Sequence, residues 1–332
     1  MEKTQMTFDK NFFKEEVRHD FPIPSLMKRA WAAEIEVLQV VADICNRHDI
    51  MYFADYGTLL GAVRHQGFIP WDDDIDISLK RPDYNRLISC LRTELPPGFV
   101  MTGMFADRED LRDAALLPYI RVIADDKYWN FTNYLKRFHA FPFFRVGIDI
   151  FPLDYVPRNP ELSDWQKIII QEIHHFFNMD EKTFSASERN AQLQKVETLC
   201  NVTLPRSSAL QNSLWKLYDS ISSLYTYEEA DYITEYTYWI EIPQYIPKKE
   251  CFDEFILLPF ENILVPAPKR YDEVLSAEYG DYMTPSREGT DHAYPFYAKQ
   301  EKALADVFRQ QGITQSIPEF CDNFAMINHC DS

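Results

Sequence analysis

Positive charge is in short supply in this sequence. Its 34 lysine and arginine residues stand against 52 aspartate and glutamate residues, which gives a formal net charge of −18 at pH 7. Proteins that bind nucleic acid or anionic lipid by general electrostatic attraction need a basic face. The composition therefore argues against nucleic acid as a partner and leaves at most a peripheral association with membranes. A phosphate-bearing substrate would need a bound metal ion or a few placed cations.

Long apolar runs and paired cysteines are also missing. No stretch approaches the ~18 uncharged apolar residues of a transmembrane segment, and the N-terminus lacks the apolar region of a signal peptide. We therefore expect a cytoplasmic protein. The six cysteines form no C-x-x-C pair, and no second pair completes the zinc-like spacing of Cys45 and His48. We expect all six to be reduced thiols.

Apolar residues, at 46%, and aromatic residues, at 15%, are plentiful and indicate a globular protein with an aromatic-rich core. Hydrophobic spacing predicts alternating helices and strands in the first half of the chain. The predicted helices span 25–48, with Ser25 as the N-terminal cap, and 83–95. The predicted strands span 51–54, 72–79, 117–123 and 145–151. This order indicates an α+β fold, with a mixed sheet flanked by helices.

The pattern divides the chain into three expected regions. Residues 1–160 form the α+β core with its N-terminal helix. Residues 161–230 form a mainly helical subdomain, because three helical segments between 164 and 227 are separated near 178–184 and at Pro205. Residues 231–332 contain a hairpin at 252–265, a helix at 269–279 and an irregular tail that packs back on the core.

Glycine is scarce, with nine residues in the chain, yet Gly57, Gly61 and Gly67 fall close together directly after a predicted strand. Glycine allows backbone N–H groups to approach a phosphate closely, and a helix that starts at Thr58 would add its positive dipole end. An ordinary tight turn explains the same glycines equally well when they are considered alone.

An acidic segment follows, in which Asp72, Asp74 and Asp76 lie two residues apart, and the apolar residues Ile75, Ile77 and Leu79 occupy alternate positions. On a strand, this alternation places the three carboxylates on one face. Two carboxylates ~4 Å apart repel by about 4 kcal/mol at an effective dielectric constant of ~20, so such a row favours a bound cation. Magnesium, or manganese in its place, suits oxygen ligands of this kind. The alternative is a solvated acidic loop, which the apolar entry Ile69–Trp71 disfavours.

A further acid, Asp149, lies between Ile148 and Ile150 on a predicted strand, where an isolated charge would be costly. If its strand lies beside that of Asp74 and Asp76, the three acids converge on a site for one or two metal ions. A carboxylate that is hydrogen-bonded for structural reasons is the alternative. Asp154 reads as a capping acid at the strand end.

Three segments carry a resemblance to a known family: YGTLLGAVRHQGFIPWDDDIDISLKRPDY, GIDIFPLDYVP and LSAEYGDYMTP. They resemble the motifs of the LicD family, which includes phosphocholine transferases and is related to the fukutin-type transferases. The resemblance covers residues 51–285 and is weakest in the helical middle. It implies a nucleotidyltransferase-like fold in which Gly57 and Thr58 form the phosphate turn. Asp74 and Asp76 match the paired metal ligands, and Asp149 matches the third acid.

The resemblance further implies transfer of a phospho-alcohol, such as phosphocholine from CDP-choline, to a hydroxyl of a surface carbohydrate or glycolipid. We expect Mg²⁺ at Asp72, Asp74, Asp76 and Asp149, with the last three acting in catalysis. The donor phosphates would contact Gly57, Thr58, Arg64 and His292. Arg64 has an alternative role at a helix end, and His292 has one as a hydrogen-bonded loop residue.

Two other functions keep the same fold. One is nucleotidyl transfer from an NTP, and the other is a non-catalytic module that binds nucleotide or carbohydrate. The adjacent residues His174 and His175 face different directions on a predicted helix, so we assign them no metal. The aromatic segment with Tyr232, Tyr236, Tyr238 and Trp239 could enclose a quaternary ammonium group, although core packing also accounts for it.

Overall fold

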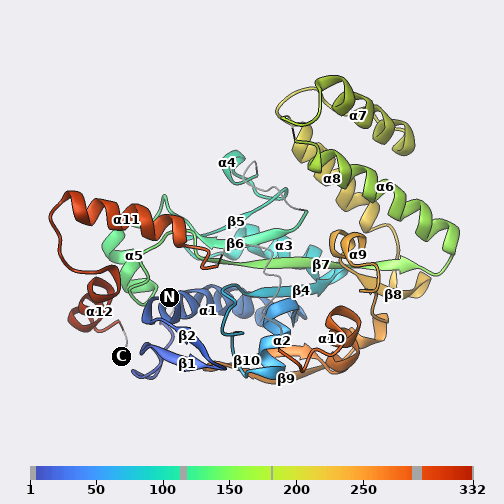
Figure 1. Ribbon diagram of the computed structural model, residues 1–332. Coiled ribbons are helices and arrows are strands. Elements are labelled where there is room, and N and C mark those ends of the chain that lie inside the picture. Colours follow the sequence, from blue (N-terminus) through green and yellow to red (C-terminus); the bar gives the residue numbers. More distant parts are fainter. Residues whose placement is uncertain (1–4, 113–117, 181, 286–293, 331–332) are drawn as a thin grey trace.

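The computed structural model describes residues 5–112, 118–180, 182–285 and 294–330 (Figure 1). The first half of the chain alternates helices and strands after a short N-terminal hairpin. Its elements are β1 (Glu16–Arg18), β2 (Phe21–Ile23), α1 (Ser25–Arg47), β3 (Phe53–Ala54), α2 (Tyr56–Arg64), β4 (Asp76–Lys80), α3 (Arg81–Glu94), β5 (Phe99–Thr102), α4 (Glu109–Arg112), β6 (Ile120–Ala124), α5 (Phe131–Arg137) and β7 (Gly147–Pro157).

The second half is mainly helical, with one more sheet strand and a second hairpin. Its elements are α6 (Pro160–Asn178), α7 (Ala186–Cys200), α8 (Leu210–Ser222), the 3₁₀ turn η1 (Tyr227–Glu229), β8 (Ala230–Thr234), α9 (Tyr236–Glu241), η2 (Lys249–Phe252), β9 (Phe255–Phe260), β10 (Ile263–Pro268), α10 (Tyr271–Tyr279), α11 (Ala298–Gln310) and α12 (Ile317–Asn328).

A six-stranded mixed sheet organises the molecule. Its strand order is β3-β4-β7-β6-β5, and β8 pairs with the far end of the long strand β7. The pairing of β4 with β7 is parallel, whereas the other pairings are antiparallel. The α+β fold expected from the sequence is therefore confirmed. The central pair β4 and β7 carries the acids on which the functional hypothesis depends.

Helix α1 packs against the sheet and contacts both β6 and β7, while α3 contacts β4 and β7. Trp31, Ile35 and Val41 are completely buried, which is the expected result of an apolar pattern around most of the helix surface. The predicted cap at Ser25 is wrong. Pro24 occupies the N-cap position, and no side chain caps the first turn.

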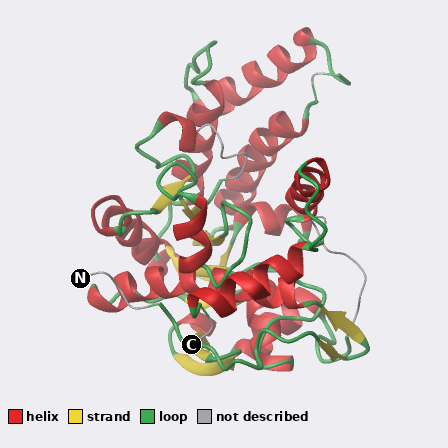
Figure 2. Cartoon of the chain, turned by 90° about the vertical axis from the view of Figure 1, so that its left-hand side faces the viewer, coloured by secondary structure: helices red, strands yellow, loops and turns green. Residues whose placement is uncertain are grey.

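Helices α6, α7 and α8 stand away from the sheet at one end, above it in both Figure 1 and Figure 2. They surround their own apolar cluster, in which Ile169, Ile173 and Val196 are fully buried. The rings of Phe177 and Trp215 stack there with a centroid distance of 3.6 Å. The three helices and the breaks between them follow the sequence prediction closely.

Two further predicted features differ from the structure. The strand predicted at 72–79 begins at Asp76, because β3 is too short to pair with the residues before it. The predicted irregular tail contains α11 and α12 instead. Helix α12 begins with a capping box between Ser316 and Glu319, a local signal that explains why a helix forms there. In the described part of the chain, no helix combines the length and apolar character needed to cross a bilayer.

Candidate active site

Two of the predicted acids lie side by side in the sheet. In the parallel pairing of β4 and β7, Asp76 is the direct partner of Asp149, and neighbouring strands lie ~4.8 Å apart. Both acids are partly exposed, whereas Ile77 and Ile150, the next residues along each strand, are buried. The acids therefore share one face of the sheet, and the isoleucines face the other way.

The segment before β4 carries the remaining acids of the motif and is held by α1. The indole of Trp31 stacks on Phe68 at a centroid distance of 4.7 Å. Its Nε1 donates a hydrogen bond to the backbone oxygen of Asp72 at 3.3 Å. The backbone N–H of Asp72 in turn donates to the oxygen of Ile69, which closes a tight turn. These contacts hold the backbone of the acidic segment in place before β4, so the segment is not a solvated loop.

Unlike the neighbouring acids, Asp73 makes a structural contact with the C-terminal part of the chain. It is fully buried, and its Oδ2 accepts a hydrogen bond from the backbone N–H of Phe296 at 2.6 Å. The hydroxyl of Tyr294 also donates to the backbone oxygen of Pro70. Asp73 therefore attaches the C-terminal segment to the acidic motif. This contact brings residues more than 220 positions apart to the edge of the candidate site.

The predicted phosphate turn at Gly57 and Thr58 lies against the same acids. A Cβ atom at Gly57 would overlap Oδ2 of Asp72, so a larger residue would require the Asp72 side chain to move. The hydroxyl oxygen of Thr58 accepts a hydrogen bond from the backbone N–H of Asp76 at 2.9 Å. The Thr58 hydroxyl proton is still able to donate to another group. Asp55 caps the N-terminus of α2 by accepting from the Tyr56 N–H. The start of α2 is therefore fixed beside the carboxylates.

Electrostatic repulsion is concentrated at these acids. The pKa of Asp76 is raised well above its ordinary value, first by burial and then by the charges of Asp74, Asp149 and Asp72. On α1, burial and the nearby acids Asp73 and Asp74 raise the pKa of Glu34 in the same way. Glu34 Oε2 has no hydrogen-bond partner among the described residues. The sequence analysis missed Glu34, although this carboxylate lies between apolar residues, Ala33 and Ile35, of the predicted helix.

Arg121 is a second residue that the sequence analysis missed. It lies opposite Asp149 in the pairing of β6 with β7, and its Nε forms an ion pair with Oδ1 of Asp149. The hydroxyl of Tyr119 donates a hydrogen bond to the other carboxylate oxygen at 3.2 Å. An arginine that alternates with Ile120 and Val122 on a buried strand could have been recognised as a site residue. Its side chain is half exposed and able to reach a bound anion.

These groups fit a divalent cation of the magnesium class. The donors are carboxylate oxygens, with no sulfur or imidazole ligand in the group, and Mg²⁺ prefers such ligands. Asp72, Asp74 and Asp149 each raise the pKa of Asp76. Arg121 forms an ion pair with Asp149 and offsets part of this negative charge. A cation would lower the repulsion that this arrangement creates.

The other two predicted phosphate ligands are Arg64 and His292. The Arg64 guanidinium donates from Nη1 to the backbone oxygen of Tyr282 at 2.8 Å and from Nε to His65. These contacts tie the end of α2 to the segment after α10, so a role in phosphate binding stays a prediction. His292 lies outside the described residues.

Asp154 is a structural residue, but it is not a strand-end cap as predicted. Strand β7 continues to Pro157, and Asp154 is buried within it. Both of its carboxylate oxygens accept hydrogen bonds from Arg81 at 2.6 Å. Arg81 also bonds Asp219 of α8, so this ion pair connects the sheet to the helical group.

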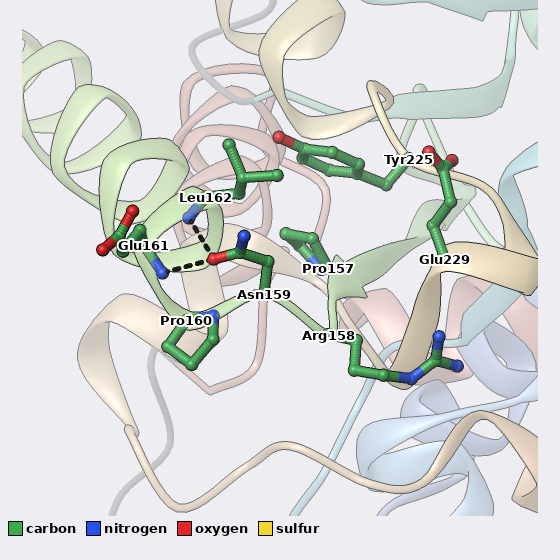
Figure 3. A pocket seen from close by; sticks show the side chains of 8 residues that line it. All are labelled: Pro157, Arg158, Asn159, Pro160, Glu161, Leu162, Tyr225 and Glu229. Carbon is green, nitrogen blue, oxygen red and sulfur yellow. Dashed lines mark hydrogen bonds between the residues drawn. The ribbon is translucent and has the colours of Figure 1, made fainter.

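Two other places in the described structure have groups that could contact a ligand. A surface hollow is lined by residues around Pro157 and Asn159, at the far end of β7 (Figure 3). It lies eight residues along the strand from Asp149, a distance of ~26 Å. The Asn159 side chain is occupied in capping α6, because its oxygen accepts from the N–H groups of Glu161 and Leu162. The hollow is therefore separate from the acids.

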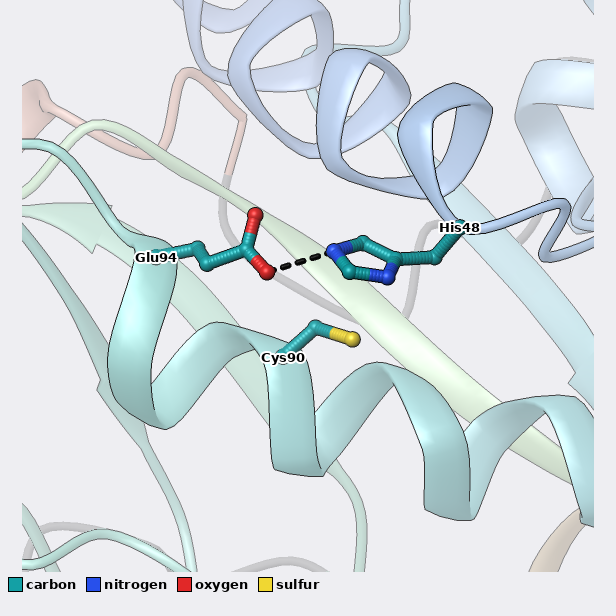
Figure 4. A group of neighbouring side chains, drawn as sticks. All are labelled: His48, Cys90 and Glu94. Atoms are coloured by element: carbon teal, nitrogen blue, oxygen red, sulfur yellow. Dashed lines mark hydrogen bonds and ion pairs between the residues drawn. The ribbon is translucent and has the colours of Figure 1, made fainter.

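His48, Cys90 and Glu94 form a cluster whose potential ligand atoms lie within 4.8 Å of one another (Figure 4). The carboxylate of Glu94 already binds His48 Nε2 at 2.5 Å and Arg47 at 2.8 Å. Arg86 also donates to the backbone oxygen of His48. Two guanidinium groups beside the cluster disfavour a bound cation, and we assign it a structural role.

Comparisons with known proteins indicate the family of the chain. Residues 49–160 match the sequence profile described as LicD/FKTN/FKRP, nucleotidyltransferase domain. The chain is 30% identical over 256 residues to a lipopolysaccharide cholinephosphotransferase LicD of Haemophilus influenzae, an alignment that covers 75% of this chain and 88% of that protein. It is 44% identical over 153 residues to an uncharacterized protein of Rickettsia prowazekii, covering 41% of this chain and 56% of that protein. The matched residues include Asp72, Asp74, Asp76 and Asp149, whereas Glu34 lies before them.

Proposed function

The chain belongs to the LicD family and is a transferase of the LicD type, and on this basis we propose that it transfers phosphocholine from CDP-choline to a hydroxyl group of a glycan or glycolipid. The Haemophilus relative, which acts on lipopolysaccharide by its name, supports this choice of group and of acceptor class. We propose Mg²⁺ as the cofactor, held by Asp72, Asp74, Asp76 and Asp149.

The observation that carries the proposal is the pairing of Asp76 with Asp149 next to the start of α2. Carboxylates placed beside a helix N-terminus provide two complementary functions. The acids can hold a cation, and the free N–H groups of the first helical turn can bind the phosphate oxygens that the cation also attracts. Such a pair of subsites suits a diphosphate donor better than an uncharged ligand.

When bound, magnesium would neutralise charge on the donor diphosphate and on the departing nucleotide. The protein's own groups would orient the reactants. Thr58 fixes the backbone of Asp76 and can donate its hydroxyl proton to a phosphate oxygen. Arg121 holds one oxygen of Asp149, and its half-exposed guanidinium can also contact the transferred phosphate. Phosphoryl transfer depends mainly on positioning and electrostatic stabilisation of this kind.

In the proposed reaction the acceptor hydroxyl oxygen attacks the phosphorus atom of the phosphocholine unit. A new P–O bond to the glycan forms, the bond to the nucleotide breaks, and CMP departs with the bonding electron pair. Asp149 is placed to accept the hydroxyl proton, since its carboxylate lies on the exposed face of the sheet. Tyr119 and Arg121 hold that carboxylate in position.

The test is turnover of CDP-choline with saturating Mg²⁺, followed by product analysis. We expect release of CMP by the wild-type protein and its loss, by roughly a hundredfold or more, in the variants Asp74→Asn and Asp76→Asn. Arg145→Gln is a suitable control, because Arg145 pairs with Asp126 on the surface. Wild-type rates in either acid variant would remove the metal assignment. Release of pyrophosphate from CTP, without CMP release from CDP-choline, would indicate nucleotidyl transfer instead.

A further inference from the structure

A row of aromatic rings extends from the acids along the same face of the sheet. We call it the tyrosine wall; it consists of Tyr56, Tyr119, Phe151, Tyr238 and Tyr245. The ring centroids of Tyr119 and Phe151 lie 4.2 Å apart, and those of Phe151 and Tyr56 lie 5.1 Å apart. Tyr238 contacts Tyr56 at 4.9 Å and Tyr245 at 5.0 Å. All except Tyr245 are partly exposed, so the wall has a surface that a ligand can reach.

The tyrosine wall is continuous with the candidate active site. Tyr119 donates its hydroxyl proton to Asp149. Phe151 lies two residues after Asp149 on β7, so the two side chains share a face. Tyr56 directly precedes Gly57 at the start of α2. A ligand with its phosphates at the acids would therefore extend over these rings.

Three buried carboxyl groups lie behind the wall: Asp55, Glu235 and Glu278. All three raise the pKa of the Tyr56 and Tyr245 hydroxyls, which places them around these two rings. Glu235 is occupied in capping α9, with its oxygens accepting from the Thr237 and Tyr238 N–H groups. Within the described ranges, no lysine, arginine or histidine forms an ion pair with any of the three carboxyl groups. The region thus combines buried carboxyl groups and aromatic rings, and in the described part of the chain no basic side chain is paired with those carboxyl groups.

Glu278 is the most informative of the three. It belongs to the segment LSAEYGDYMTP, which the sequence analysis singled out but to which the proposed reaction gives no role. Its side chain is 6% exposed, and neither carboxylate oxygen makes a well-formed hydrogen bond to another described residue. The phenols of Tyr238 and Tyr279 are its polar neighbours, and they lower the pKa of the carboxyl against the larger raising effect of burial. Burying a carboxylate beside phenols and without a paired cation is costly unless a ligand compensates for its charge.

We propose that the tyrosine wall and Glu278 bind the quaternary ammonium group of the choline carried by the donor. The inference rests on the proposed function and specifies how the transferred alcohol is recognised. Aromatic faces attract a cation through their quadrupole, and a trimethylammonium group needs no hydrogen-bond acceptor. A bound cation favours the ionised form of Glu278, whose carboxylate then supplies the opposite charge. Tyr236 and Trp239 of the same aromatic segment are buried in the helical group and take no part.

Isothermal titration calorimetry with the full chain and Mg²⁺ tests this assignment, using CDP-choline, CDP-ethanolamine and CDP as probes. We expect the wild-type protein to bind CDP-choline at least tenfold more tightly than CDP, and more tightly than CDP-ethanolamine. Glu278→Gln and Tyr238→Leu should each lose this preference while the affinity for CDP is unchanged. Tyr232→Leu is the matched control, because Tyr232 is exposed on β8 and outside the wall. Thermal unfolding identifies any variant that fails to fold, and the second variant then carries the test.

An unchanged preference for CDP-choline in both variants would overturn the inference, as would equal binding of CDP-choline and CDP by the wild type. Equal binding of CDP-ethanolamine would refute the quaternary ammonium assignment. Turnover separates this inference from the proposed function. If the protein prefers CDP-choline through Glu278 but releases no CMP, the proposed reaction is refuted and this inference stands. If CMP is released but both variants bind as the wild type does, this inference is refuted and the proposed reaction stands.

Discussion

The Cα atom of Gly57 lies directly against the carboxylate of Asp72, so closely that a Cβ atom would overlap Oδ2 of that side chain. The glycine that was expected to let a phosphate approach the backbone therefore also allows an acid to approach it. The start of α2 and the acidic segment are consequently one unit, and a change at either residue should disturb both.

Gly57→Ala should leave the fold intact but lower turnover strongly. The atom in the way belongs to a side chain, so Asp72 can rotate away at small cost in stability. This rotation would alter the acid group, and we expect a loss of roughly tenfold to a hundredfold in kcat/KM. Gly312→Ala is the control, because Gly312 has φ +71° with open space around it. That substitution should cost about 1–2 kcal/mol of stability and leave activity unchanged. Full activity of Gly57→Ala would refute the coupling.

Arg121→Gln tests whether the ion pair with Asp149 serves the reaction. The Arg121 side chain is half exposed beside the acids. Removing the ion pair should therefore lower the free energy of unfolding by only about 1 kcal/mol or less. Loss of a cation from the reacting centre should nevertheless lower kcat by roughly a hundredfold. The experiment compares steady-state rates with the free energy of unfolding measured in urea. A variant that loses stability but keeps its kcat would assign Arg121 to structure alone.

Asp154→Asn should lower stability and leave kcat unchanged, which is the opposite of the result expected for Arg121→Gln. Asp154 is buried with Arg81, and removal of one partner leaves an uncompensated charge. We expect the free energy of unfolding to fall by about 3–5 kcal/mol. The kcat of the folded fraction should be unchanged, since Asp154 contacts Arg81 and not the acid group. A specific loss of kcat without a loss of stability would show that the second acid of β7 also belongs to the active site.

Stability should decrease as the pH rises from about 4.5 to about 7, in part because of Glu235. Burial raises the pKa of this carboxyl from 4.5 to about 7. The folded protein therefore binds a proton that the unfolded chain has already released, and the free energy of unfolding falls with increasing pH in this window. The effect is about 3 kcal/mol at most. Glu235→Gln should flatten this part of the pH profile, whereas a profile of unchanged slope would refute the assignment to Glu235.

The sequence predicted those parts of the fold in which local pattern and packing agree. Helix α1 and the three helices α6, α7 and α8 have apolar spacing that matches their buried faces. The alternation around Asp76 and Ile77 likewise predicted opposite faces, although only the second half of that segment is a strand. Boundaries were less predictable, because β4 begins where its neighbouring strands provide partners.

The features of the fold and the site that could not be predicted from the sequence depend on long-range contacts. Nothing local indicates that Asp73 would bind the backbone of Phe296, or that Arg121 would lie opposite Asp149. Glu278 is similarly distant from Tyr56 in the chain but close to it in the fold. Residues separated by many positions meet only through the sheet order and helix packing. Single residues such as Asp149 could be proposed because an acid on a buried strand is costly in any fold.

The central claim is that Asp74, Asp76 and Asp149 hold a divalent cation beside the start of α2. The most direct test is a crystal structure with Mn²⁺ and CDP, in which anomalous scattering locates the metal. We predict a peak ~2.0–2.2 Å from carboxylate oxygens of Asp74 and Asp76, with a CDP phosphate oxygen as a further ligand. A structure that contains CDP but no metal at these acids, or one whose only metal lies at His48, Cys90 and Glu94, would contradict the claim.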